Sequence, residues 1–182
     1  MHVFVDESYR DGRYLLAAAV VYLGDLRRLR VVMRGLLLPG QREVHLKTER
    51  HRRGQLLDQV VNAGARGQVY GAATSGRRGQ EAARVVCLQW LVKDLLAAGA
   101  HRLVLDSRQD RDLADARVIR AALGRHPAAS HLIYEHVDSA SEPLIWVADM
   151  IGWVYGAGGE WRRRVIPALL GVTALLGVTD CG

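Results

Sequence analysis

An Asp-Gly pair between two apolar runs is the feature that most limits how this chain can fold. Residues 2–8 and 14–23 are rich in Val, Leu and Ala, and the short segment RDGR separates them, with Asp11 and Gly12 at its centre. Such a pair between two apolar runs is a strong short-range signal for a β-hairpin. The sequence therefore predicts that the fold opens with an antiparallel pair of strands.

Helices and strands alternate after this hairpin. The spacing of apolar residues predicts helices over 25–38, 49–63, 79–98, 111–123 and 142–155, and strands over 68–74, 102–106 and 131–137. Ser141 is expected to cap the last of these helices. This order predicts an α/β fold with a mixed sheet, antiparallel at its start and largely parallel later, and with helices on both faces.

The length of the chain favours one domain. Its 182 residues suffice for a substantial core, and there is no internal repeat or long linker. Residues 1–182 are therefore expected to form a single domain, with 157–182 as a C-terminal helical extension. The apolar stretch 165–178 is too short and too interrupted, by Pro167 among others, to span a bilayer, and it is expected to form a buried terminal helix.

Basic residues exceed acidic ones, and most of them are arginine. The net charge is +6, and only two of the 25 basic residues are lysine, Lys47 and Lys93. The planar fork of arginine suits phosphate, so the charge is compatible with a nucleic-acid partner. A GC-rich genome would produce the same arginine bias, so both explanations stay open.

The cysteines and the first residues bear on the compartment. Cys87 and Cys181 are far apart and belong to no Cys/His cluster, which argues against a zinc finger or a disulfide framework. The chain enters a strand at once, without the pattern of a secretory signal. We expect a cytoplasmic protein with no membrane association.

Two aspartates follow apolar strands. Asp6 comes after VFV and Asp106 after LVL, each at or near the expected carboxyl end of its strand. Open α/β sheets bind ligands at that edge, and neighbouring strands would bring both carboxylates together there. A single aspartate at the end of a strand more often caps a helix or a turn, which is the alternative for each.

Asp149 is expected on an apolar face of a helix. Its neighbours one turn away are Ile145, Trp146, Gly152 and Trp153. A buried carboxylate is normally neutralised, paired or bound to a metal, because an unpaired buried charge is costly. The alternative to a metal is an ion pair with one of the arginines.

Small residues beside Asp149 predict that its helix lies close to the sheet. Ala148 and Gly152 would bring Asp149 toward the strand ends. Three carboxylates meeting there would repel one another and raise each other's pKa unless a cation intervened. Oxygen ligands of this kind select Mg²⁺ or Mn²⁺, and a pair of such ions can activate water and stabilise a leaving oxygen.

The segment EVHLK adds a further candidate. On a strand, Glu43, His45 and Lys47 would share one face and could supply a ligand, a proton shuttle and a phosphate contact. The alternatives are a solvated strand edge or the lead into a helix. Glu7 would lie on the face opposite Asp6, so it is expected to be a structural or hydrogen-bonding residue.

Four segments together resemble a known family. VFVDES, EVHLK, LVLDSRQD and DSASEPLIWVADMIGWVYG follow one another between Val3 and about Gly156, and in this order they are similar to the DUF3800 proteins, which are viewed as ribonuclease H-like. The resemblance implies a metal-dependent nuclease or related phosphoryl-transfer enzyme. It implies that acids of the first strand, a later strand and the last helix hold the ions. The residues that match are Asp6, Asp106 and Asp149, with Glu43 and His45 in the Glu-x-His segment and Ser139 before the last helix.

The leading hypothesis is a Mg²⁺ or Mn²⁺-dependent nuclease of ribonuclease H-like fold that acts on DNA or RNA. The expected catalytic residues are Asp6, Glu43, His45, Lys47, Asp106 and Asp149, and the four carboxylates among them are the expected metal ligands. The alternative is a non-catalytic member of the fold that binds nucleic acid or a protein. A third possibility is that the acids form a purely structural network with arginines.

Overall fold

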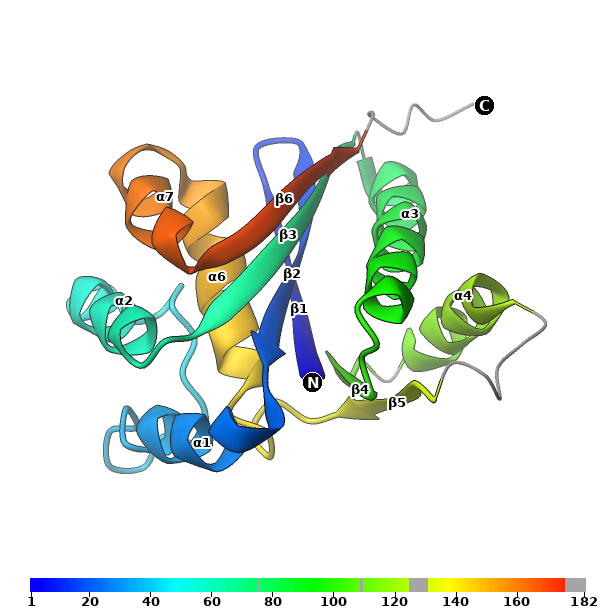
Figure 1. The fold of residues 1–182 in the computed structure, drawn as a ribbon. Helices are drawn as coiled ribbons and strands as arrows, with labels where there is room; N and C mark the ends of the chain where they lie inside the picture. The colour runs from blue at the N-terminus through cyan, green and yellow to red at the C-terminus, as the bar shows by residue number, and fades with distance from the viewer. Residues whose placement is uncertain (75, 109, 125–130, 176–182) are drawn as a thin grey trace.

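A computed structural model describes residues 1–74, 76–108, 110–124 and 131–175. Their centre is a six-stranded sheet in the order β5-β4-β1-β2-β3-β6 (Figure 1). The antiparallel neighbours are β1–β2 and β2–β3, whereas β1–β4, β4–β5 and β3–β6 are parallel, so the predicted mixed sheet is confirmed. The strands are β1 (His2–Arg10), β2 (Arg13–Val21), β3 (Arg66–Ala73), β4 (Arg102–Asp106), β5 (Ile133–Val137) and β6 (Leu169–Leu175).

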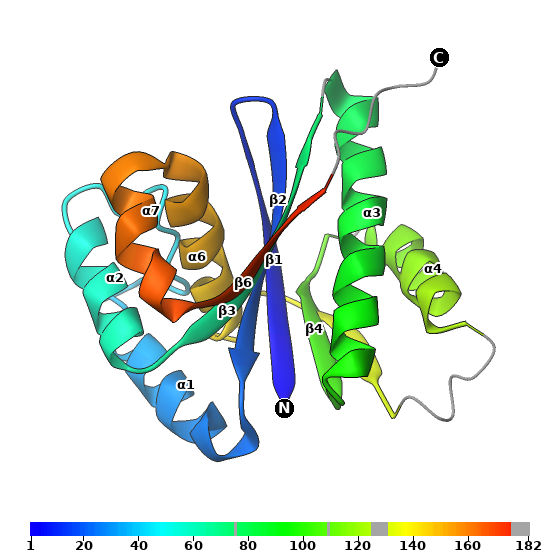
Figure 2. The ribbon, with the colours of Figure 1, turned by 45° about the horizontal axis from the view of Figure 1, so that its top comes forward.

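Helices cover both faces of the sheet, as predicted. Figure 2 shows α1, α2, α6 and α7 on one side and α3 and α4 on the other. None of the helices within the described ranges is both long enough and apolar enough to cross a bilayer. The helices are α1 (Leu26–Arg34), α2 (Arg53–Asn62), α3 (Gly76–Ala97), α4 (Asp112–Leu123), α6 (Ile145–Ala157) and α7 (Gly159–Val165), with 3-10 turns η1 (Leu23–Asp25) and η2 (Ile166–Ala168).

The predicted hairpin joins β1 and β2. Arg10 pairs with Arg13, and the two residues between them have positive φ angles, 50° at Asp11 and 71° at Gly12. Two positive φ angles define the tight turn whose twist matches that of the flanking strands, and Asp-Gly accommodates them readily. The turn therefore fixes the register of the first strand pair.

Side chains of β1 alternate between two buried cores. Phe4 packs with α1, α2 and α6, whereas Val3 and Val5 pack with α3 and α4. Because side chains alternate along a strand, Asp6 lies on the α6 side and Glu7 on the α3 side. The expectation that Glu7 makes structural hydrogen bonds on the face opposite Asp6 is confirmed by its bond from the Tyr14 hydroxyl, at 2.6 Å.

The expected helix over 165–178 is wrong within the described residues. Helix α7 ends at Val165, and Leu169–Leu175 form β6, which extends the sheet in parallel beside β3. Pro167 cannot continue a helical hydrogen-bond ladder, and the β-branched residues after it fit a strand. An apolar run of this length is ambiguous between helix and strand until an open sheet edge is available to pair with it. Residues 176–178 lie outside the described part.

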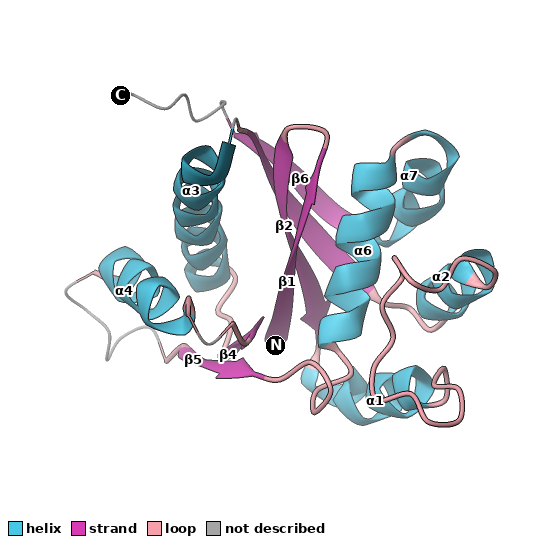
Figure 3. Cartoon of the chain, turned by 180° about the vertical axis from the view of Figure 1, so that it is seen from behind, coloured by secondary structure: helices cyan, strands magenta, loops and turns pink. Residues whose placement is uncertain are grey.

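The expected strand at 43–47 is a loop between α1 and α2. Its side chains still alternate, because Val44 and Leu46 are buried whereas Glu43, His45 and Lys47 are not. Its backbone bonds to side chains of α6 and α2, and Figure 3 shows it running alongside α6.

Helix α6 begins later than expected. It starts at Ile145, and Ser141 lies in the preceding turn with its N–H bonded to the carbonyl of Asp138 at 2.8 Å. The cause is Pro143, because a proline disfavours the helical conformation of the residue before it. The residue at the N-cap position is Leu144, which makes no side-chain cap bond, so the expected serine cap is wrong.

Helix α6 packs closely on β1 and β2 through Ala148, Gly152 and Gly156. A Cβ atom at Gly152 would lie only 3.2 Å from the Cβ of Ala17, and one at Gly156 only 3.1 Å from a methyl of Leu15. Ala148 is fully buried. The predicted close approach of this helix to the sheet is therefore present.

The opposite face of the sheet holds a buried ion network centred on Arg84. Its guanidinium pairs with Glu7 and with Asp115, and its Nε donates to Asp115 at 2.7 Å. All three side chains are at most 10% exposed. Because the two carboxylates share one arginine, the network holds α3, α4 and β1 together.

We predict that Arg84→Met lowers the free energy of unfolding by up to about 3–5 kcal/mol, because it removes the arginine that two buried carboxylates share and leaves Glu7 with Arg108 and Asp115 with His136 as their charged partners. Arg28→Met is the matched control, since the ion pair of Arg28 with Asp25 is exposed and should contribute about 1 kcal/mol or less. Urea unfolding of both variants measures the difference. Equal losses would mean that the buried network does not hold the elements together.

Candidate acidic site and its basic pocket

Asp6 and Asp106 lie side by side at the point where β4 ends. The last residues paired between β1 and β4 are Val5 and Leu105, and the two aspartates follow directly. Asp106 is the last residue of β4, as predicted, but β1 continues to Arg10. Asp6 is therefore not at a strand end. It lies where β1 loses its β4 neighbour, which leaves room for its carboxylate beside the sheet.

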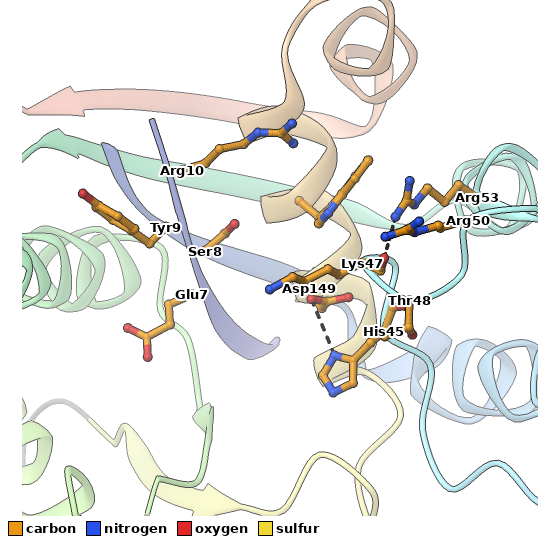
Figure 4. A pocket seen from close by; sticks show the side chains of 11 residues that line it. Glu7, Ser8, Tyr9, Arg10, His45, Lys47, Thr48, Arg50, Arg53 and Asp149 are labelled. Carbon is orange, nitrogen blue, oxygen red and sulfur yellow. Dashed lines mark hydrogen bonds and ion pairs between the residues drawn. The ribbon is translucent and has the colours of Figure 1, made fainter. Parts of the chain in front are cut away.

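Asp149 reaches the same place from α6. Its Oδ2 accepts the backbone N–H of Leu46 at 2.9 Å, and its Oδ1 is 3.8 Å from Nδ1 of His45 (Figure 4). Asp6 and Asp106 face α6 as well, because they follow Phe4 and Val104 at the alternate positions of their strands. The three acids therefore converge on one face of the sheet from three different elements.

The alternative that arginines neutralise these three acids is not observed among the described residues. Within them, no Arg or Lys side chain pairs with Asp6, Asp106 or Asp149, and the ion pair of Asp149 is with His45. Arg108 lies near Asp106 but pairs with Glu7 on the other face. Asp6 and Asp106 consequently lack a basic partner among the described Arg and Lys residues, and the partner of Asp149 is His45.

Burial and mutual repulsion perturb two of these acids. Burial, together with the charges of Asp149 and Asp106, raises the pKa of Asp6 to about 7. The N–H of Glu7, which donates to Asp6 at 2.7 Å, acts in the opposite direction and lowers this pKa. Burial also raises the pKa of Asp106, opposed by the N–H of Ser139 at 3.2 Å. Shifts in this direction are expected where carboxyl groups are poorly solvated and close to one another.

Glu43 and His45 join the site through the loop before α2. Nε2 of His45 is 3.3 Å from Glu43, whose other oxygen accepts the hydroxyl of Ser139 at 2.6 Å. Contact with Asp149 and the charges of Asp149 and Glu43 raise the pKa of His45 to about 9. His45 is therefore protonated at neutral pH and is the cation closest to Asp149. Ser139 links Glu43 to Asp106, because its N–H bonds to Asp106.

A pocket of about 760 Å³ opens beside Asp149 and His45 (Figure 4). Lys47, the remaining predicted residue, lines this pocket and forms no ion pair within the described chain. Sequence reasoning missed the other basic residues and the tryptophan that line it. The available signals were the basic run after Lys47 and the one-turn spacing from Asp149 to a tryptophan. The missed residues are Arg10, Arg50, Arg53 and Trp153.

The donor atoms at the acidic site are of the kind that binds a hard divalent cation, but the side chains are not arranged in coordination geometry. Carboxylate oxygens are the ligands that Mg²⁺ and Mn²⁺ prefer. In the part of the chain that the structure describes, no three His, Cys, Asp or Glu side chains are arranged as a metal site. The residues fit such an ion by the chemistry of their oxygen ligands and because no described Arg or Lys neutralises Asp6, Asp106 or Asp149.

Comparisons with known proteins identify the fold. No family model matches the chain, and the search of curated proteins finds no match, so the resemblance to the DUF3800 family stays a prediction. A structure search finds the PCNA:RNase HII complex from Archaeoglobus fulgidus, with a TM-score of 0.51 and 17% identity over 86% of this chain and 72% of that chain. At this identity the likeness concerns the fold alone. The chain has a ribonuclease H-like fold.

Proposed function

We propose that this protein is a Mg²⁺ or Mn²⁺-dependent nuclease that hydrolyses phosphodiester bonds of nucleic acid. The observation that carries the proposal is the convergence of Asp6, Asp106 and Asp149, without a basic partner among the described Arg and Lys residues, on one face of a ribonuclease H-like sheet. A buried acid whose pKa is raised by neighbouring acids is typical of a functional site. Burial is the main cause of the raised pKa of Asp6, and a divalent cation would offset both this cost and the repulsion by Asp149 and Asp106.

The carboxylates of Asp6, Asp106 and Asp149 would hold the metal, and Glu43 would be a fourth ligand. When bound, a divalent cation activates water and stabilises charge on the phosphate. Because Asp106 and Glu43 both bond to Ser139, that serine holds their side chains in a defined relation. Asp149 is oriented by the N–H of Leu46, which leaves its Oδ1 directed toward His45.

His45 and Lys47 would act on the substrate side of the acids. His45 lies between Glu43 and Asp149, so its imidazole can exchange a proton with the leaving oxygen or, when protonated, offset charge on the phosphate. Lys47 lines the pocket, where an ammonium can contact a phosphate of the bound strand. Both assignments follow from position, because His45 and Lys47 line the same pocket as Asp149.

We predict that Mg²⁺ or Mn²⁺ raises the thermal unfolding temperature of the wild type and leaves that of Asp106→Asn unchanged. Ligand binding to the native state alone stabilises it by about 2.7 kcal/mol at 100 times the dissociation constant. Asp58→Asn is the control, because Asp58 is an exposed carboxylate paired with Arg164. A wild type that does not respond to either ion would rule out the metal site.

We predict that the wild type cleaves labelled DNA or RNA with Mn²⁺ or Mg²⁺ and that Asp149→Asn reduces the rate by about 100-fold or more, the scale for losing a group that stabilises the transition state. Asp58→Asn should retain wild-type activity. Gel analysis of single-stranded, duplex and hybrid substrates measures both. Salt-sensitive binding that survives a chelator, with no cleavage of any polymer, would favour the non-catalytic binding protein instead.

A further inference from the structure

Basic side chains that line the pocket lack acidic partners, unlike basic residues nearby. Lys47, Arg50 and Arg53 form no ion pair with any described carboxylate, and Arg10 has only the exposed Asp11, at 3.7 Å. Outside the pocket, by contrast, the ion pairs Arg30–Glu142, Arg52–Glu49 and Arg164–Asp58 are each 2.6 Å or less between charged atoms. The pocket therefore concentrates positive charge that the protein does not neutralise.

Trp153 organises two of these arginines. The guanidinium carbon of Arg53 lies 4.4 Å from the centre of the indole, and that of Arg10 lies 5.7 Å from it. Attraction between a guanidinium and an aromatic face contributes about 0.5–1 kcal/mol at exposed sites. Arg10 comes from the end of β1 and Arg53 from the start of α2, so one ring holds cations from two elements at the same rim.

Arg53 is also fixed by the loop that carries His45. Its Nε donates to the carbonyl of Leu46 at 2.7 Å and its Nη2 to that of Lys47. Its Nη1 makes no hydrogen bond to a described residue, and the side chain lines the pocket. A guanidinium held in this way loses little conformational entropy when it binds an anion, which favours tight binding.

The acids and the basic residues are continuous in space. Asp149 and Trp153 are one turn apart on α6, and His45 and Lys47 are neighbours on the loop. Figure 4 shows Asp149 and His45 at one side of the pocket, with Arg10, Arg50 and Arg53 farther from His45. A strand whose scissile phosphate lay at the acids would place its next phosphates in this pocket.

We propose that this pocket binds consecutive phosphates of a polynucleotide strand next to the bond that the acids act on, with Arg10, Arg50 and Arg53 as phosphate ligands and Trp153 as a positioning residue. The proposal rests on the proposed function for its location, and names a polynucleotide, not a mononucleotide, as the substrate. The support for a polynucleotide is the number of basic side chains in the pocket. They come from β1, from α2 and from the loop between α1 and α2, and a single phosphate could not contact them all. Because the guanidinium of Arg53 lies against the indole ring, Trp153 positions that guanidinium and does not stack on a base.

The experiment measures binding of a fluorescent single-stranded oligonucleotide by anisotropy, in EDTA, over a range of salt concentrations. Each phosphate contact contributes about 0.9 to the slope of log affinity against log salt, or about 0.7 for single strands. Arg53→Ala should weaken binding several-fold and lower the slope by about one contact. Arg164→Ala, which removes an arginine stacked on Trp161 outside the pocket, should change neither.

Trp153 is tested with two variants whose folding is checked by thermal unfolding. Trp153→Leu should weaken oligonucleotide binding although no charge is lost, and Trp153→Phe should restore much of the affinity because it keeps an aromatic face. Equal affinities of the Leu and Phe variants would overturn the positioning role. A mononucleotide that displaces the probe as well as an unlabelled oligonucleotide would overturn the polynucleotide assignment.

Equal effects of Arg53→Ala and Arg164→Ala, or no binding in EDTA, would overturn the pocket proposal. Neither result would contradict the proposal of a metal-dependent nuclease, because stabilisation by metal and cleavage are measured in separate experiments. Conversely, pocket-specific binding without any cleavage or metal response would refute the nuclease and retain the pocket.

Discussion

Close packing of α6 on β1 and β2 governs the acidic site. Gly152 allows the helix to approach until a Cβ at that position would be 3.2 Å from Ala17, and Ala148 is fully buried in the same contact. The residue between them on the helix, Asp149, is thereby brought near Asp6, whose pKa burial and the Asp149 charge raise to about 7. A larger residue at 152 would separate the helix from the sheet and the acids from each other.

The two adjacent carboxylates of β1 meet opposite surroundings. Glu7 is bonded to Tyr14 and paired with Arg84 on the α3 face, so its charge is neutralised within the core. Asp6 has no such partner among the described Arg and Lys residues, and its nearest charges include Asp149 and Asp106. The fold thus neutralises one of the two adjacent carboxylates of β1 and leaves the other without an Arg or Lys partner among the described residues. That asymmetry is the physical basis for assigning the α6 face to ligand binding.

The hairpin and the convergence of Asp6, Asp106 and Asp149 followed from sequence patterns, because turn residues and strand alternation are local properties. The strand β6 did not, since an apolar run becomes a strand only when an open sheet edge pairs with it. The pocket was also missed. Arg53 lines it because it stacks on Trp153 and bonds to a loop that has no regular structure. The basic run after Lys47 was visible in the sequence, but the contact between Arg53 and Trp153, one hundred residues apart, leaves no periodic pattern.

The most direct test of this account is an NMR titration of the Asp6 carboxyl in the wild type and in Asp149→Asn, without and with Mg²⁺. The account predicts a wild-type pKa of about 7 without metal, a lower pKa in Asp149→Asn because a repelling charge is gone, and a lower pKa when Mg²⁺ is added to the wild type. A pKa near the usual value of about 4 in both proteins, unaffected by Mg²⁺, would contradict it.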